Sequence, residues 1–243
     1  MTSLSKNARV AGLIYLLLTM IAPFRLIYIP TKLFVDGDAG ATASNIAAHE
    51  SLFRLGIAGD LLAGAISLFV TFALYRLLRG VNKNCALLML LLGFMDTPLY
   101  FFNVLNDAAA LILVKGTDFL SVFDKPQRDA LAMLFLKMHS QMIGFSEVFW
   151  GLWLFPLAIL VFRSGFLPRF FGIWLAVNGI AYLTLSFTAL LLPQYVDIVS
   201  SVAFPCQLGE VAFMLWLVVM GARPRRMTAI RGKDDMANSA LMS

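Results

Sequence analysis

Ionisable side chains inside long apolar stretches are the residues through which this chain could do chemistry. Five of them lie deep in such stretches: Arg25, Asp60, Asp96, Glu147 and Glu210. A charge surrounded by apolar groups is costly unless it is paired or hydrated. Each of the five is therefore expected to have a partner, a proton or a ligand.

Three of these residues are expected to share one level. Arg25, Asp60 and Glu147 each lie 16 residues from a basic residue at one end of their own segment, and these ends all lie on the same side. The three basic residues are Arg9, Arg76 and Arg163. At a helical rise of about 1.5 Å per residue, each lies about 24 Å from that side. The sequence therefore predicts a salt bridge from Arg25 to Asp60 or to Glu147.

A polar stripe follows the third apolar segment. Asp96, Tyr100, Asn103 and Asp107 are spaced by four, three and four residues, which places them on one face of a helix. Pro23, Pro98 and Pro205 lie near the polar groups and are expected to bend their helices there. The residues expected to form a ligand or ion pocket are Arg25, Asp60, Asp96, Tyr100, Asn103, Asp107, Glu147, Gln207 and Glu210.

The balance of charge in this zone suggests a function. Arg25 is its one deep cation, so carboxylates outnumber their partners, and at least one should be protonated, hydrated or bound to a cation. Because the polar groups crowd the outer half of the segments and the inner half is largely apolar, we expect a cavity that opens outward. The leading hypothesis is a pocket that binds or moves a small ligand, a proton or a cation. The alternative is an assembly or regulatory protein whose buried charges only fix its fold.

A third hypothesis, a metal-dependent membrane enzyme, depends on the two histidines. His49, His139 and Asp107 could form a metal site at the outer rim, but no His-Glu-x-x-His or comparable spacing is present. We therefore interpret both histidines as solvated loop residues and predict no metal site. No Gly-x-Ser-x-Gly, triad or phosphate loop occurs, so the sequence offers no positive evidence for catalysis and identifies no cofactor.

The elements that position these residues are membrane-spanning helices. Of the 243 residues, 60% are hydrophobic and 14% charged, and the mean hydropathy is +0.83. The apolar stretches do not alternate apolar and polar residues as the strands of a membrane barrel do. They therefore predict an all-α, polytopic membrane protein with a bundle of six transmembrane helices in the lipid bilayer. The expected spans are 8–29, 55–78, 85–113, 131–162, 170–192 and 198–221.

Lysine and arginine counts predict the orientation. Twelve lie on the side of both termini and five on the other, so both termini are expected in the cytoplasm. Residues 1–222 form the predicted single transmembrane domain, and 223–243 a disordered basic cytoplasmic tail. That tail is expected to lie near anionic lipid headgroups rather than to bind nucleic acid.

The outer connections carry helix-start signals. Ser44 is a candidate N-cap for a short helix at the outer surface within 31–53. Asp124, with Gln127 three residues later, predicts a capping box at the start of the fourth span.

Four phrases of the chain carry a family resemblance: IYIPTKLFVDGDAGATASNIAAHESLFRLGIAGDLL, NVLNDAAALIL, FRSGFLPR and GEVAFMLWLVVMG. With these, nearly the whole chain resembles a bacterial family of six-helix membrane proteins known as domain of unknown function 4386. The resemblance implies six helices and a bacterial inner-membrane setting. It implies no activity, substrate or catalytic residue.

Overall fold

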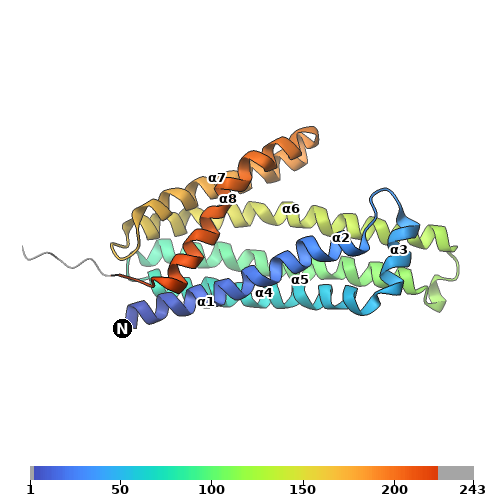
Figure 1. Cartoon of the computed structure of the whole chain (residues 1–243), viewed down its shortest axis with the longest axis horizontal. Coiled ribbons are helices and arrows are strands. Elements are labelled where there is room, and N and C mark those ends of the chain that lie inside the picture. The colour runs from blue at the N-terminus through green and yellow to red at the C-terminus, as the bar shows by residue number, and fades with distance from the viewer. Residues whose placement is uncertain (1–2, 224–243) are drawn as a thin grey trace, which may run out of the picture.

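Long helices make up the computed structural model, which describes residues 3–223 (Figure 1). Six helices in that part of the chain are long and apolar enough to cross a membrane, and it contains no strand, so the predicted fold class is confirmed. The predicted tail lies outside the described residues, apart from Arg223. The six spans are Ser3–Leu33, α4 (Glu50–Leu78), α5 (Lys83–Lys115), α6 (Lys125–Arg163), α7 (Arg169–Leu191) and Pro193–Val219.

Two of the spans are composite. The first consists of α1 (Ser3–Pro23), a π-helical turn η1 (Phe24–Tyr28) and α2 (Ile29–Leu33). The last consists of a short 3₁₀ turn, η3 (Pro193–Tyr195), followed by α8 (Val196–Val219).

The spans form a closed ring. Each packs against the next along the chain, from α1 to α4, α5, α6, α7 and α8, and α8 returns to pack against α1. Large apolar side chains such as Phe69, Leu105 and Ile180 are more than half exposed on the outside of the ring. Because there are too few polar groups to cover these surfaces, a lipid bilayer is their natural surrounding.

Glycines allow the close contacts that hold the ring together. A Cβ atom at Gly12 would come within 2.7 Å of the Val218 backbone nitrogen, so α1 and α8 touch almost directly. Gly151 and Gly179 face each other in the same way across α6 and α7. Small residues of this kind let membrane helices approach closely.

The halves of α7 and α8 that lie next to η3 stand apart from the other helices. Figure 1 shows this hairpin leaning away from the end of the bundle where α3 lies. The apolar contacts in this part, around Ala181, Leu185 and Ala203, form a small core separate from the main one. The ring is thus tightly closed near the start of α1 and the end of α8, and it is looser at the opposite end.

The connections at that opposite end test two capping predictions. The short helix is α3 (Ala39–Ala48), and its N-cap is Asp38, whose carboxylate accepts a hydrogen bond from the Ala41 amide, so the prediction of Ser44 was wrong. Aspartate following a glycine turn satisfies the first free amides, which leaves Ser44 inside the helix. The capping box of Asp124 and Gln127 is confirmed at the start of α6.

Candidate functional site: a charged cluster beside a central cavity

Arg25 lies in the π-helical turn of the first span. The turn follows Pro23, which has no amide hydrogen, and it closes with the Ile29 amide donating to the Phe24 carbonyl five residues earlier. Gly56 on α4 lets that helix pack closely against the turn, because a Cβ there would lie 3.3 Å from the Ile29 Cγ1 atom. Local geometry therefore aims a 3% exposed guanidinium between α4, α5 and α6.

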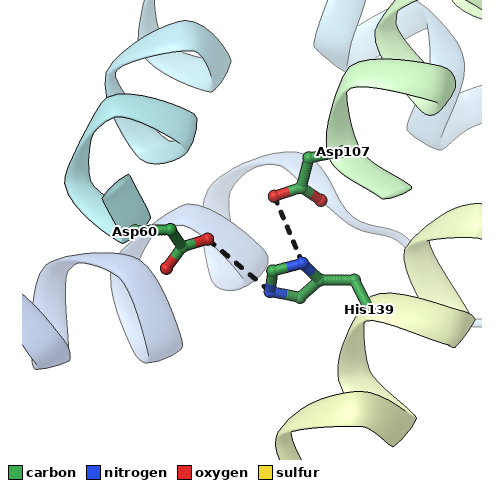
Figure 2. Close-up of side chains that lie close together, drawn as sticks. All are labelled: Asp60, Asp107 and His139. Carbon is green, nitrogen blue, oxygen red and sulfur yellow. Dashed lines mark ion pairs between the residues drawn. The ribbon is translucent and has the colours of Figure 1, made fainter. Parts of the chain in front are cut away.

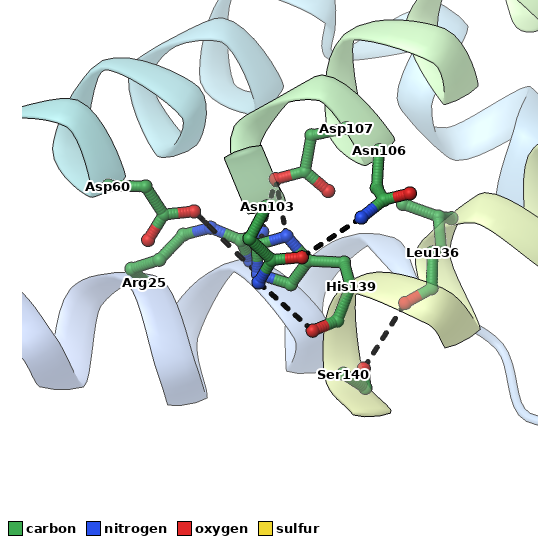
Figure 3. Close-up of polar contacts among 8 residues, drawn as sticks. All are labelled: Arg25, Asp60, Asn103, Asn106, Asp107, Leu136, His139 and Ser140. Carbon is green, nitrogen blue, oxygen red and sulfur yellow. Dashed lines mark hydrogen bonds and ion pairs between the residues drawn. The ribbon is translucent and has the colours of Figure 1, made fainter. Parts of the chain in front are cut away.

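The guanidinium binds three side chains from three other spans (Figure 3). Arg25 Nε donates to Asp60 Oδ2 at 2.6 Å. Arg25 Nη2 donates to Asp107 Oδ2 and also lies 2.8 Å from His139 Nε2. We call Arg25, Asp60, Asp107 and His139 the Arg25 cluster. All four residues are less than a tenth exposed, so the spans are joined there by buried charge.

The contacts define the state of His139. A guanidinium can only donate hydrogen bonds, so Nε2 must accept, and a neutral ring carries its proton on Nδ1. Nδ1 lies 3.4 Å from Asp107 Oδ2 (Figure 2). The Asn103 side-chain amide donates to the backbone carbonyl of His139 at 3.1 Å and so ties α5 to α6 at the same level.

The predicted salt bridge of Arg25 with Asp60 is confirmed, and Glu147 is not a partner of Arg25. The prediction that His139 is a solvated loop residue was wrong, since it is 4% exposed, whereas His49 is exposed as expected. Glu147 lies eight residues from His139 along α6, about 12 Å at the helical rise. Glu147 therefore lies at a different level along the bundle from the Arg25 cluster.

Two carboxylates and an imidazole make the Arg25 cluster a possible metal site. Asp60, Asp107 and His139 each offer a ligand atom, and these atoms all lie within 4.8 Å of one another (Figure 2). This donor set suits Zn²⁺ or another divalent transition metal. The guanidinium already bonds to the same atoms, however, so a metal ion and Arg25 would compete for them.

A cavity of about 260 Å³ lies next to the Arg25 cluster, at the centre of the ring. All six spans contribute to its lining. The predicted pocket residues that line it are Arg25, Asp60, Asp96, Tyr100, Gln207 and Glu210. Asn103 and Asp107 lie in or beside the Arg25 cluster instead, and Glu147 is outside the cavity lining.

The two remaining acids of the cavity differ in how well they are paired. Glu210 accepts hydrogen bonds from the Tyr15 hydroxyl and, at 3.3 Å, from the Asn178 amide. Asp96 is 7% exposed, and its Oδ1 atom has no hydrogen-bond partner. A buried carboxylate oxygen without a donor is unusual, so it calls for an explanation.

Aromatic rings form much of the remaining wall, and the sequence interpretation did not assign them to the pocket, apart from Tyr100. Trp150 stacks on Tyr100 with ring centroids 6.3 Å apart, and it meets Tyr182 edge-on at 5.7 Å. Tyr15 and Trp153 form a second pair at 6.4 Å. Trp150 lies three residues after Glu147, a predicted pocket residue, which was the one available signal.

Comparison with known proteins gives the family but no chemistry. A sequence model described as domain of unknown function DUF4386 matches residues 10–221. An uncharacterised protein of Archaeoglobus fulgidus is 27% identical over 168 residues, which cover 69% of this chain and 84% of that protein. No solved structure matches the chain.

Proposed function

The chain belongs to the family of domain of unknown function 4386, and we propose that it binds a small ligand in the central cavity, within the membrane. One observation carries the proposal. The Asp96 carboxylate is buried and lines a cavity, yet one of its oxygens has no partner. A bound molecule would supply the missing donor and fill the space.

The energetics favour a ligand over an empty void. Leaving a buried polar group unsatisfied costs about 1 to 3 kcal/mol, and more for a charged one. In a mere packing void the partnerless Asp96 Oδ1 would be an uncompensated cost, which an apolar residue would remove. Binding sites, in contrast, keep a few convergent polar groups in a mostly apolar hollow, as this cavity does.

The Arg25 cluster has a supporting role in this proposal. Its guanidinium is already bonded by two carboxylates and one imidazole, so it fixes the wall of the cavity on the side of α4, α5 and α6. The hypothesis that buried charges only fix the fold therefore applies to the Arg25 cluster, while Asp96 and Glu210 remain for the ligand. If the protein is a carrier, the same cavity holds the transported molecule.

The setting we propose is the bacterial inner membrane, with both termini in the cytoplasm and the cavity open to the outer side. The excess of lysine and arginine in the segments beside the termini supports this orientation. The looser end of the ring, where α7 and α8 lean away, would then face outward.

A matched pair of alanine variants tests the proposal. Ala63 lines the cavity, whereas Ala58 is exposed on the same helix. Native mass spectrometry of protein released directly from membranes should detect a bound small molecule on the wild type and on Ala58→Leu. Ala63→Leu, which fills the cavity, should lack it. A bare wild type, or the same bound mass on Ala63→Leu, would contradict the proposal.

A second candidate function is metal binding by the Arg25 cluster, which the closeness of the Asp60, Asp107 and His139 ligand atoms favours. Elemental analysis of the purified protein decides between the two. We expect no stoichiometric metal, because Arg25 occupies the ligand atoms. One bound metal per chain, lost in His139→Ala, would favour the metal site instead.

A further inference from the structure

The charge and the aromatic lining of the cavity identify the class of its occupant. We infer that the cavity takes a small organic cation with apolar substituents, an amine or quaternary ammonium, whose charged group lies against Asp96. This inference rests on the proposed function and goes beyond it by naming the ligand chemistry.

The first argument is charge. Among the lining residues Arg25 is the sole basic side chain, and its Nε and Nη2 atoms already bond to the other members of the Arg25 cluster. Asp60 is paired with Arg25, which leaves Asp96 and Glu210 as the lining carboxylates that have no basic partner. A ligand anion would add like charge, and a neutral apolar ligand would leave the Asp96 oxygen unpaired.

The second argument separates the two remaining acids. Glu210 has donors from Tyr15 and Asn178, so its charge is stabilised by the protein itself. Asp96 interacts with the Trp150 side chain, but its Oδ1 atom stays free. The ligand's positive charge therefore belongs at Asp96, on the wall made by α5 and α6.

The third argument is the aromatic row beside that carboxylate. Tyr100, Trp150 and Tyr182 form a continuous set of rings from α5 to α7, and all three line the cavity. The faces of such rings attract cations, and quaternary ammonium groups are commonly held by aromatic cages next to an acid. The same rings provide apolar surface for the substituents of the ligand.

The fourth argument excludes a bare metal cation in the cavity. Hard ions such as Ca²⁺ take six to eight oxygen ligands at about 2.3 to 2.6 Å. The cavity surface is instead mostly apolar and aromatic, with Val70, Phe149 and Trp153 among the lining residues. A space of about 260 Å³ whose lining surface is mostly apolar is larger than a dehydrated ion needs and suits an organic molecule.

Three probes of similar size and different charge test the inference on the full chain in lipid nanodiscs. They are benzyltrimethylammonium, its neutral carbon isostere neopentylbenzene, and the anion benzenesulfonate. Binding is read from the thermal midpoint and from quenching of tryptophan fluorescence, because Trp150 and Trp153 line the cavity. We expect benzyltrimethylammonium alone to raise the midpoint and quench the fluorescence.

Two matched carboxylate variants locate the charge. Asp96→Asn keeps the side-chain shape and should weaken benzyltrimethylammonium binding at least tenfold. Asp197→Asn, at an exposed position at the start of α8, should leave it unchanged. Gel filtration of each variant checks that the fold is retained.

The outcomes separate the inference from the proposed function. Equal binding of neopentylbenzene or benzenesulfonate, or cation binding unchanged by Asp96→Asn, would overturn the cationic ligand and leave a ligand cavity. Stabilisation by Na⁺ or Ca²⁺ in place of the ammonium would likewise overturn it. If no probe binds and Ala63→Leu raises the thermal midpoint, the cavity is a packing void, and both proposals fail.

Discussion

Replacing Arg25 by leucine tests the physical role of the Arg25 cluster. The change removes the one cation and leaves Asp60 and Asp107 buried, at 4% and 0% exposure. Removing one partner of a buried pair costs about 3 to 5 kcal/mol because a charge is stranded. Two carboxylates are stranded here, although protonation of one of them limits the loss. We therefore expect Arg25→Leu to lower the free energy of unfolding by about 3 to 5 kcal/mol.

A compensating variant separates stranded charge from lost packing. Arg25→Leu combined with Asp60→Asn and Asp107→Asn has no buried charge in the Arg25 cluster. Removing a whole buried ion pair is often close to neutral, so the triple variant should recover most of the stability. The assay is reversible unfolding in mixed micelles, followed by circular dichroism.

Arg54→Leu is the control for this series. Arg54 pairs with Glu50 one turn away, but its side chain is 56% exposed. Exposed pairs contribute at most about 1 kcal/mol. If Arg25→Leu costs no more than Arg54→Leu, or if the triple variant is no more stable than the single one, the reasoning about the buried Arg25 cluster is refuted.

Three further predictions concern the fold. Gly12→Leu should destabilise the α1–α8 contact and lower the thermal midpoint by several degrees, whereas Gly80→Leu, with open space around it, should not; equal effects would contradict the packing. Asp124→Ala should cost about 1 kcal/mol in unfolding experiments through loss of the α6 cap, and no loss would mean that the cap is redundant. Reporter fusions after Arg79 should read cytoplasmic and those within 36–48 external, and the reverse pattern would contradict the orientation.

Local patterns in the sequence predicted the elements well. Six apolar runs fix the spans because each must satisfy its backbone inside lipid, and Asp124 with Gln127 marks the start of α6. The pairing of Arg25 with Asp60 was also predictable, since neither charge is stable alone at that depth.

The contacts of Asp107 and His139 with Arg25 were not predicted, because counting residues assumes that all basic ends lie in one plane. Asp107 and His139 lie 24 residues from Lys83 and Arg163, about 36 Å by the same count. They nevertheless contact Arg25, which the same count places only about 24 Å from its basic end. The longer helices α5 and α6 are therefore offset along the bundle, an offset set by tertiary packing.

The aromatic wall was missed for a different reason. Trp150 and Tyr182 read as ordinary lipid-facing or core residues, because aromatic side chains are common throughout membrane helices. Only the ring of six spans brings them to one cavity beside Asp96. Their part in a site depends on contacts between helices that no local spacing encodes.

The central claim is that a ligand occupies the cavity at Asp96, and the most direct measurement is an experimental density map of the protein in nanodiscs with benzyltrimethylammonium. The account predicts density for the probe between the aromatic rings, with its ammonium group against Asp96 Oδ1, in the wild type and not in Ala63→Leu. An empty cavity, or one in which the Asp96 oxygen has found a donor from the protein itself, would contradict the account.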